Sequence, residues 1–178
     1  MAKRKGESPP LIYVDTCVYL DLLTQEPLPH PRTSDPRWKA AKELLDAVND
    51  GRVTLGTSAL VDAEVGRFAA QRDDGETFLK KVRGWFDARD CKYTDVDRVL
   101  ARDAARLAKE WRDYAEARKK MKGADAMHLA AAIRLGCDYL MTGDGGFPVG
   151  QTVEGVKVSY TEVVWQQTIF ELAEFDHS

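Results

Sequence analysis

Cysteine is scarce in this sequence, and its thiols stand far apart. The 178 residues include three cysteines, Cys17, Cys91 and Cys137. An odd number at such wide spacing matches neither a disulfide framework nor a zinc site built from paired cysteines. A reducing cytoplasm is the simplest environment for such a chain, and we expect it to work there.

Long hydrophobic runs are also absent. The start, MAKRKGESPP, carries a basic cluster, but the apolar stretch that follows covers only residues 11–14. This stretch is too brief for the core of a signal peptide or for a membrane span. We therefore expect neither secretion nor a membrane partner, and residues 1–10 are predicted to be a flexible basic tail.

The chain has no excess of positive charge. Its formal net charge is −3, so it has no general attraction to nucleic acid, and such a partner would have to be held by local basic patches or by a metal ion. A composition of 44% hydrophobic and 31% charged residues is ordinary for a water-soluble fold. The length fits one domain, predicted over residues 1–178.

Short apolar runs alternate with helical patterns along the chain. Strands are predicted over residues 11–15, 51–58, 91–96, 137–141 and 155–160. Helices are predicted over residues 16–23, 39–49, 59–71, 76–88, 123–135 and 161–175, with Thr57 or Ser58 capping the third. A long charged helix is predicted to begin at Asp95 or Asp97 and to run to about residue 120. The proline-rich stretch between residues 25 and 38 is predicted to be a surface loop. Strands separated by helices predict a three-layer α/β/α sandwich around a parallel sheet of about five strands.

Three aspartates are predicted to meet at one edge of this sheet. Asp15 ends the first strand, and Asp144 follows the fourth strand in the turn Gly-Asp-Gly-Gly. Asp125 begins the nearly all-apolar helix that precedes that strand, and this helix runs antiparallel to it. All three therefore lie at the carboxyl edge, where open α/β proteins usually bind their ligands.

Each of these aspartates also has a purely structural interpretation. Asp125 can sit in the first helical turn, where a negative charge meets the positive end of the helix dipole. Asp144 can simply serve a turn. A functional role requires several carboxylates to converge.

The segment TSALVDAEVGRF supplies a fourth carboxylate. Glu64 lies on the apolar stripe of a predicted helix, four residues after Leu60 and four before Phe68. Asp62 is about 200° from Leu60 and faces solvent. A glutamate among core residues needs a partner, unless it extends to solvent or pairs with an arginine such as Arg67.

Four clustered carboxylates would repel one another without a cation. Oxygen ligands without a histidine or cysteine cluster favour Mg²⁺ or Mn²⁺ over zinc. Such ions, bound by carboxylates and waters, activate water and stabilise charge on phosphate. The pattern therefore favours hydrolysis of a phosphodiester bond.

With these motifs assembled, the chain resembles the PIN-domain ribonucleases, and most of all the VapC-type toxins of bacterial toxin–antitoxin pairs. The resemblance runs from about residue 11 to 164 and rests on four motifs: YVDT, TSALVDAEV, GADAMHLAAA and LMTGDGGF. It implies a PIN-like fold and a metal-dependent ribonuclease whose acids are Asp15, Glu64, Asp125 and Asp144. It also implies Mg²⁺ or Mn²⁺ as cofactor, RNA as substrate, a cognate antitoxin as partner and a homodimer as one assembly.

Several residues near these acids have both a functional and a structural interpretation. Thr16 and Thr142 stand where the family often has a hydroxyl residue, and either could support a carboxylate or a ligand water, or cap a strand end. His128 could assist catalysis, but a hydrogen-bonded histidine on a buried helix is favoured. The basic segment 117–122 could bind RNA phosphates or be a solvated helix end. Cys17 is interpreted as structural packing.

Other phosphate-processing classes fit the same residues less well. A receiver-type phosphoacceptor would need an acidic pair after the first strand and a lysine after the fifth, where the sequence has Asp15-Thr16 and Tyr160-Thr161. A haloacid-dehalogenase-type phosphatase would need a second aspartate at position 17, where Cys17 stands. The remaining alternative is a non-catalytic PIN-fold module that binds RNA or protein.

Overall fold

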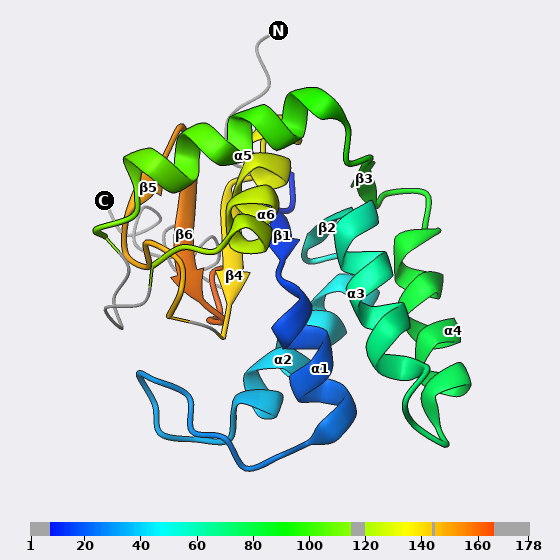
Figure 1. The fold of residues 1–178 in the computed structure, drawn as a ribbon. Helices are drawn as coiled ribbons and strands as arrows, with labels where there is room; N and C mark the ends of the chain where they lie inside the picture. Colours follow the sequence, from blue (N-terminus) through cyan, green and yellow to red (C-terminus); the bar gives the residue numbers. More distant parts are fainter. Residues whose placement is uncertain (1–7, 115–119, 144, 166–178) are drawn as a thin grey trace, which may run out of the picture.

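The fold is built around a six-stranded sheet with helices packed against it (Figure 1). The computed structural model describes residues 8–114, 120–143 and 145–165. The strands are β1 (Leu11–Val14), β2 (Thr54–Ser58), β3 (Lys92–Thr94), β4 (Tyr139–Thr142), β5 (Thr152–Val153) and β6 (Val156–Tyr160). The helices are α1 (Thr16–Thr24), α2 (Arg37–Asn49), α3 (Ala59–Ala69), α4 (Gly75–Phe86), α5 (Arg98–Glu110) and α6 (Gly123–Arg134).

The strand order is β3-β2-β1-β4-β6-β5, and every pairing except that of β5 with β6 is parallel. The predicted α/β fold with a mostly parallel sheet is confirmed. Because β1, β2, β4 and β6 point the same way, their carboxyl ends form one edge. The backbone N–H of Asp15 donates to the Met141 carbonyl at 3.0 Å and so extends the pairing of β1 and β4 to this edge.

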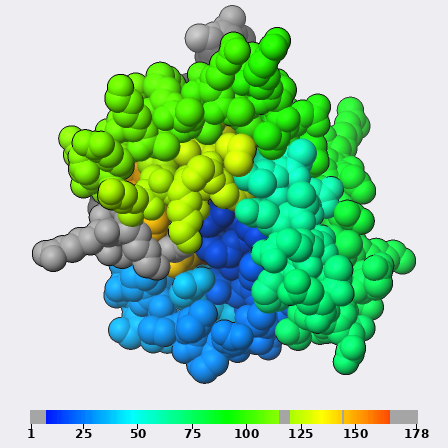
Figure 2. All heavy atoms as spheres, viewed as in Figure 1, coloured from blue at the N-terminus to red at the C-terminus, as the bar shows by residue number. Residues whose placement is uncertain are grey.

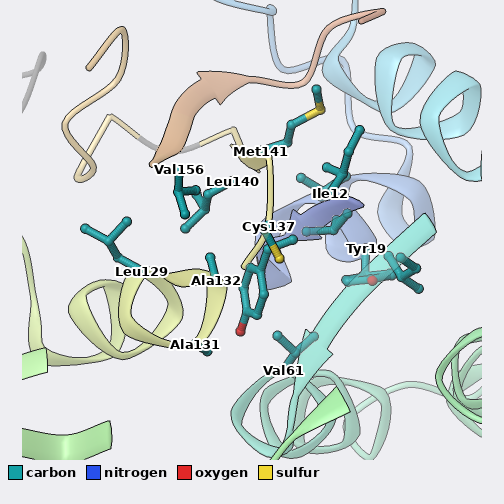
Figure 3. Close-up of a cluster of buried hydrophobic side chains, with 14 of the residues drawn as sticks. Ile12, Tyr19, Val61, Leu129, Ala131, Ala132, Cys137, Leu140, Met141 and Val156 are labelled. Carbon is teal, nitrogen blue, oxygen red and sulfur yellow. The ribbon is translucent and has the colours of Figure 1, made fainter. Parts of the chain in front are cut away.

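The two faces of the sheet bury alternate residues of each strand, as a parallel sheet covered on both sides requires. Leu140 points toward α6, where Leu129 and Ala132 lie (Figure 3). Ile12 and Met141 point to the opposite side (Figure 3). All five side chains are fully buried.

The sixth strand, β5, was not predicted. It pairs with β6 through the two-residue turn Glu154-Gly155, and both turn residues have positive φ, at 46° and 91°. This is the backbone of the type I′ turn that matches the twist of a hairpin. The sequence around the predicted fifth strand thus forms a short antiparallel hairpin at the sheet edge.

Two helices differ from their predicted bounds in the structure. α5 ends at Glu110 rather than near residue 120, and Trp111 already has non-helical dihedrals. Residues 161–165 of the predicted last helix are not helical, and its remainder lies outside the described residues. Within the described residues, no helix is long and apolar enough to cross a membrane.

Candidate functional site

The β1–α1 junction carries the first candidate carboxylate. Asp15 follows the last residue of β1 and is the N-cap residue of α1, with only 5% of its surface exposed. Its Oδ2 accepts a hydrogen bond from Thr142 Oγ1 at 2.8 Å and one from Cys17 Sγ at 2.9 Å. A carboxylate at this depth requires such donors. Thr142, at the end of β4, thus supports Asp15.

Cys17 is a structural donor rather than a nucleophile. Its Sγ donates to Asp15 and accepts the backbone N–H of Gly143 at 3.1 Å. Burial raises the pKa of the Cys17 thiol well above its ordinary value, and the charge of Asp15 raises it further. The thiol is therefore protonated at neutral pH, which agrees with the structural role predicted for it.

Glu64 reaches the same edge from α3. Its Oε2 accepts a hydrogen bond from Thr16 Oγ1 and one from His128 Nε2, the latter at 3.0 Å. Burial alone would raise the pKa of the Glu64 carboxyl, but these two hydrogen bonds and the positive charges of His128 and Arg67 together outweigh it and hold the pKa below its ordinary value. Glu64 is therefore a carboxylate at neutral pH, with 30% of its side chain exposed.

Asp62 has different surroundings. It forms an ion pair with Arg83 of α4, in which the Nε–Oδ1 distance is 3.0 Å and the arginine side chain is half exposed. The two carboxylates thus have different partners, as the helical periodicity predicts. The Asp62 side chain is 29% exposed and that of Glu64 is 30% exposed, so the prediction that Asp62 alone faces solvent is wrong.

His128 connects the carboxylates of Asp15 and Glu64. It lies on α6 with 2% of its surface exposed, and its Nε2 is 3.0 Å from Glu64 Oε2 and 3.6 Å from Asp15 Oδ1. Burial lowers the pKa of the imidazole, but the hydrogen bond to Glu64 and the charges of Asp15, Glu64 and Asp125 outweigh it and raise the pKa. A positively charged imidazole is thereby favoured between two carboxylates.

Tyr13 orients the other side of the imidazole. Its fully buried hydroxyl lies 3.0 Å from His128 Nδ1 and 2.7 Å from Ser58 Oγ. Ser58 occupies the N-cap position of α3, but its side chain does not cap the helix, so the predicted capping is wrong. The Ser58 hydroxyl instead forms a hydrogen bond with the Tyr13 hydroxyl, which is buried beside it.

Asp125 lies in the first turn of α6, as predicted. Its Oδ2 accepts the backbone N–H of Lys122 at 3.1 Å, which satisfies a donor at the start of the helix. Its negative charge also raises the pKa of His128, one turn further along α6. Asp125 therefore has the structural role of a residue in the first helical turn. Its charge also favours the protonated imidazole of His128.

Asp144 lies outside the described residues. Its neighbour Gly143 follows Thr142 at the edge, and an added Cβ there would stand 2.7 Å from the Arg37 guanidinium. Arg37 donates two hydrogen bonds to Asp21, from Nε at 2.9 Å and from Nη2 at 2.8 Å. Because Gly143 has no side chain, the Arg37 guanidinium has room to pair with Asp21.

The surface over the β1–α1 segment is set back from its surroundings. Figure 2 shows dark blue atoms, the colour of the β1–α1 segment, set back between turquoise and yellow-green atoms. Among the residues that the structure describes, no three histidine, cysteine or carboxylate side chains stand close enough to complete a metal site. The edge brings Asp15 and Glu64 together through His128, with Thr16 and Thr142 as donors.

The sequence analysis does not single out Tyr13, whereas His128 is, as predicted, a hydrogen-bonded histidine on a buried helix. A signal for both exists: Tyr13 and Asp15 are two residues apart in an extended segment and so project to the same side. His128 stands one turn after Asp125 on the helix that covers that side.

Comparison with known proteins identifies the fold. The profile of the PIN domain matches residues 12–149, more than three quarters of the chain. The chain belongs to the PIN-domain family. A search among curated protein sequences finds no significant match to this PIN domain.

Solved structures with a similar fold include toxins of toxin–antitoxin pairs. VapBC2 from Rickettsia felis, solved with a promoter DNA fragment, has a TM-score of 0.57 and 13% identity and covers 85% of this chain and 99% of its own. A toxin–antitoxin complex from Klebsiella pneumoniae has a TM-score of 0.55 and 19% identity, with coverage of 85% and 99%. VapC20 from Mycobacterium tuberculosis, a toxin that cleaves the sarcin–ricin loop, has a TM-score of 0.52 and 20% identity, with coverage of 80% and 97%. Likeness at these identities establishes the shared fold.

Proposed function

We propose that this PIN domain is a metal-dependent endoribonuclease that hydrolyses RNA phosphodiester bonds and serves as the toxin of a toxin–antitoxin pair. The proposed acids are Asp15, Glu64, Asp125 and Asp144, with Thr16 and Thr142 in support. The observation that carries the proposal is the meeting of the buried Asp15 and the ionised Glu64 at the carboxyl edge of the sheet.

The donor chemistry of this edge fits a hard divalent cation. Asp15 and Glu64 offer carboxylate oxygens, and Mg²⁺ is usually bound by one or two carboxylates with waters in its other positions. Mg²⁺ or Mn²⁺ would supply Lewis-acid stabilisation of the charge that develops on the phosphate and lower the pKa of a bound water. The chain itself holds the carboxylates: Thr142 and Cys17 fix Asp15, while Thr16 and His128 fix Glu64.

The toxin assignment rests on the structural neighbours. One of them is described as a toxin–antitoxin complex, one as VapBC2 bound to promoter DNA, and one as a toxin that cleaves the sarcin–ricin loop. A cognate antitoxin is therefore the partner that we propose for this chain, and the homodimer implied by the sequence resemblance is proposed as its assembly. A non-catalytic PIN module that binds RNA or protein is the alternative, and the donor-supported carboxylates favour the enzyme, because buried charges without a task are costly.

Cleavage of defined RNAs by the purified chain tests the proposal. We expect hydrolysis of single-stranded RNA in the presence of Mg²⁺ or Mn²⁺, with loss of activity on EDTA treatment and recovery when the metal is restored. Cleavage that persists after thorough chelation would refute the metal mechanism. Binding of RNA without cleavage in any metal would favour the non-catalytic module.

A further inference from the structure

A line of buried polar side chains leads from the core to the carboxylates. Ser58 Oγ lies 2.7 Å from Tyr13 OH, Tyr13 OH lies 3.0 Å from His128 Nδ1, and His128 Nε2 lies 3.0 Å from Glu64 Oε2. Ser58, Tyr13 and His128, here called the buried polar chain, come from β2, β1 and α6 and are 0–2% exposed. Three separate elements thus converge on one carboxylate.

Stability alone does not account for this arrangement. Buried hydrogen bonds stabilise a fold only modestly, because they replace hydrogen bonds to water, and apolar residues of the same shape are often as stable. A fully satisfied buried network does fix one geometry. The buried polar chain therefore has the property expected of residues that hold a neighbouring side chain in one position.

The imidazole of His128 is fixed at both of its nitrogens. Tyr13 contacts Nδ1, so the ring cannot rotate away from the edge without breaking that contact. With the ring held, Nε2 faces two carboxylates of different elements, Glu64 at 3.0 Å and Asp15 at 3.6 Å. The position of the ring thereby sets where these two carboxylates stand relative to each other.

We propose that Tyr13 and His128 are positioning residues that preorganise Asp15 and Glu64 for the divalent cation, with Ser58 anchoring the far end of the chain. This inference rests on the proposed function, because it assigns a task to residues that do not themselves contact the metal. Partners that orient metal ligands typically contribute 10–100-fold in metal affinity. Breaking the chain should therefore weaken metal binding while the acids remain intact.

Tyr19 offers a matched control for Tyr13. Both tyrosines are fully buried, but the Tyr19 hydroxyl has no hydrogen-bond partner among the described residues. Tyr13→Phe and Tyr19→Phe remove the same atom from equally buried rings. Only the first of these two changes interrupts the buried polar chain.

The experiment measures Mn²⁺ binding directly, by the loss of the electron paramagnetic resonance signal of free Mn²⁺. We expect the Kd for Mn²⁺ to rise about tenfold or more in Tyr13→Phe and to stay within about twofold of wild type in Tyr19→Phe. Cleavage by Tyr13→Phe should recover at high metal concentration. The metal concentration needed for half-maximal cleavage should therefore rise by a larger factor than kcat falls. Ser58→Ala, at the end far from the acids, should move the Kd in the same direction.

Two histidine variants separate orientation from packing. His128→Gln retains an amide N–H that can donate to Glu64, whereas His128→Phe keeps a ring and offers no donor. We expect the glutamine variant to bind Mn²⁺ more tightly than the phenylalanine variant, with thermal unfolding measured on each to confirm folding.

The outcomes distinguish this inference from the proposed function. A wild-type Kd in folded Tyr13→Phe and Ser58→Ala would overturn the positioning role and leave the nuclease proposal standing. Wild-type protein that neither binds Mn²⁺ nor cleaves RNA would refute the proposed function, and the positioning role with it.

Discussion

Glu64 and Asp62 are two residues apart on α3, yet their carboxylates have different partners. Glu64 accepts hydrogen bonds from Thr16 and His128, whereas Asp62 pairs with the half-exposed Arg83. Periodicity alone predicts this difference, because residues two apart on a helix are about 200° apart. The partners of Glu64 come from α1 and α6, and no local pattern around Glu64 indicates them.

Asp125 carries two interactions that substitution can separate. Its carboxylate accepts the Lys122 N–H, and its charge acts on His128. Asp125→Asn keeps an oxygen for the N–H and removes the charge, so we expect lost cleavage with little change in stability. Asp125→Ala loses both, and its free energy of unfolding should fall by about 1 kcal/mol.

Cleavage assays and thermal unfolding of the metal-free protein check this prediction. The asparagine variant should melt at or above the wild-type temperature, because one like charge near the other acids is gone. A melting temperature lowered by many degrees in Asp125→Asn would indicate that the carboxylate is chiefly structural.

Among the elements, α5 is held at its start by a capping aspartate. Asp97 Oδ1 accepts the Leu100 N–H at 2.8 Å, and the Arg134 guanidinium of α6 binds both Asp97 oxygens at 2.9 Å. The hydrogen bonds from Arg134 and the backbone lower the pKa of Asp97 from 3.8 to about 2. A capping aspartate at position 95 or 97 is predictable from sequence, but Arg134, 37 residues away, is not.

A pH-dependent difference in stability follows from Asp97. Because the folded-state pKa is depressed, the stabilisation is complete above about pH 4 and is lost as the pH falls toward 2. We expect Asp97→Asn, which can still cap the helix, to melt below wild type at pH 6. The gap in melting temperature should narrow as the pH falls from about 4 toward 2. A gap that is constant over this range would contradict the assigned pKa.

The turn after β4 depends on a glycine for its contact with α2. In Gly143→Ala, the new methyl would overlap the Arg37 guanidinium and force it away from Asp21, which is 9% exposed. Burial already raises the pKa of Asp21 despite this arginine. We expect the free energy of unfolding to fall by about 1–3 kcal/mol.

Gly84→Ala provides the matched control, to be compared by denaturant unfolding. An added Cβ at Gly84, inside α4, would have no neighbour within 4 Å, so this variant should be stabilised by about 0.5–1 kcal/mol. Equal stabilisation by both alanines would refute the role assigned to the Arg37 contact.

Element ends were the least predictable part of the fold. α5 stops at Glu110, although its charged pattern continues, and Trp111 and Met121 both pack against the core. These contacts with the core override the helix propensity of the segment, and the charge pattern does not indicate them. The β5–β6 turn did leave a signal, since Glu154-Gly155 separates Val153 from Val156, a typical hairpin arrangement.

At the scale of the whole molecule, the parallel sheet determines which distant residues can meet. Asp15 follows β1 and Thr142 ends β4, and these strands are parallel neighbours. Their carboxyl ends therefore lie side by side, and Thr142 Oγ1 donates to Asp15 Oδ2 at 2.8 Å. The alternation of strands and helices was enough to predict this edge. It could not predict the buried polar chain, because that depends on how α6 is rotated over β1.

Glu64, and not Asp62, is the α3 carboxylate that we propose for the metal-dependent catalytic site. Single-turnover cleavage rates of Glu64→Gln and Asp62→Asn at saturating Mg²⁺ distinguish the two residues. Glu64→Gln should lower the rate at least tenfold, about 1.4 kcal/mol of transition-state stabilisation, while Asp62→Asn should change it little. A larger loss in Asp62→Asn, or an unchanged rate in Glu64→Gln, would refute the assignment of Glu64 to the catalytic site.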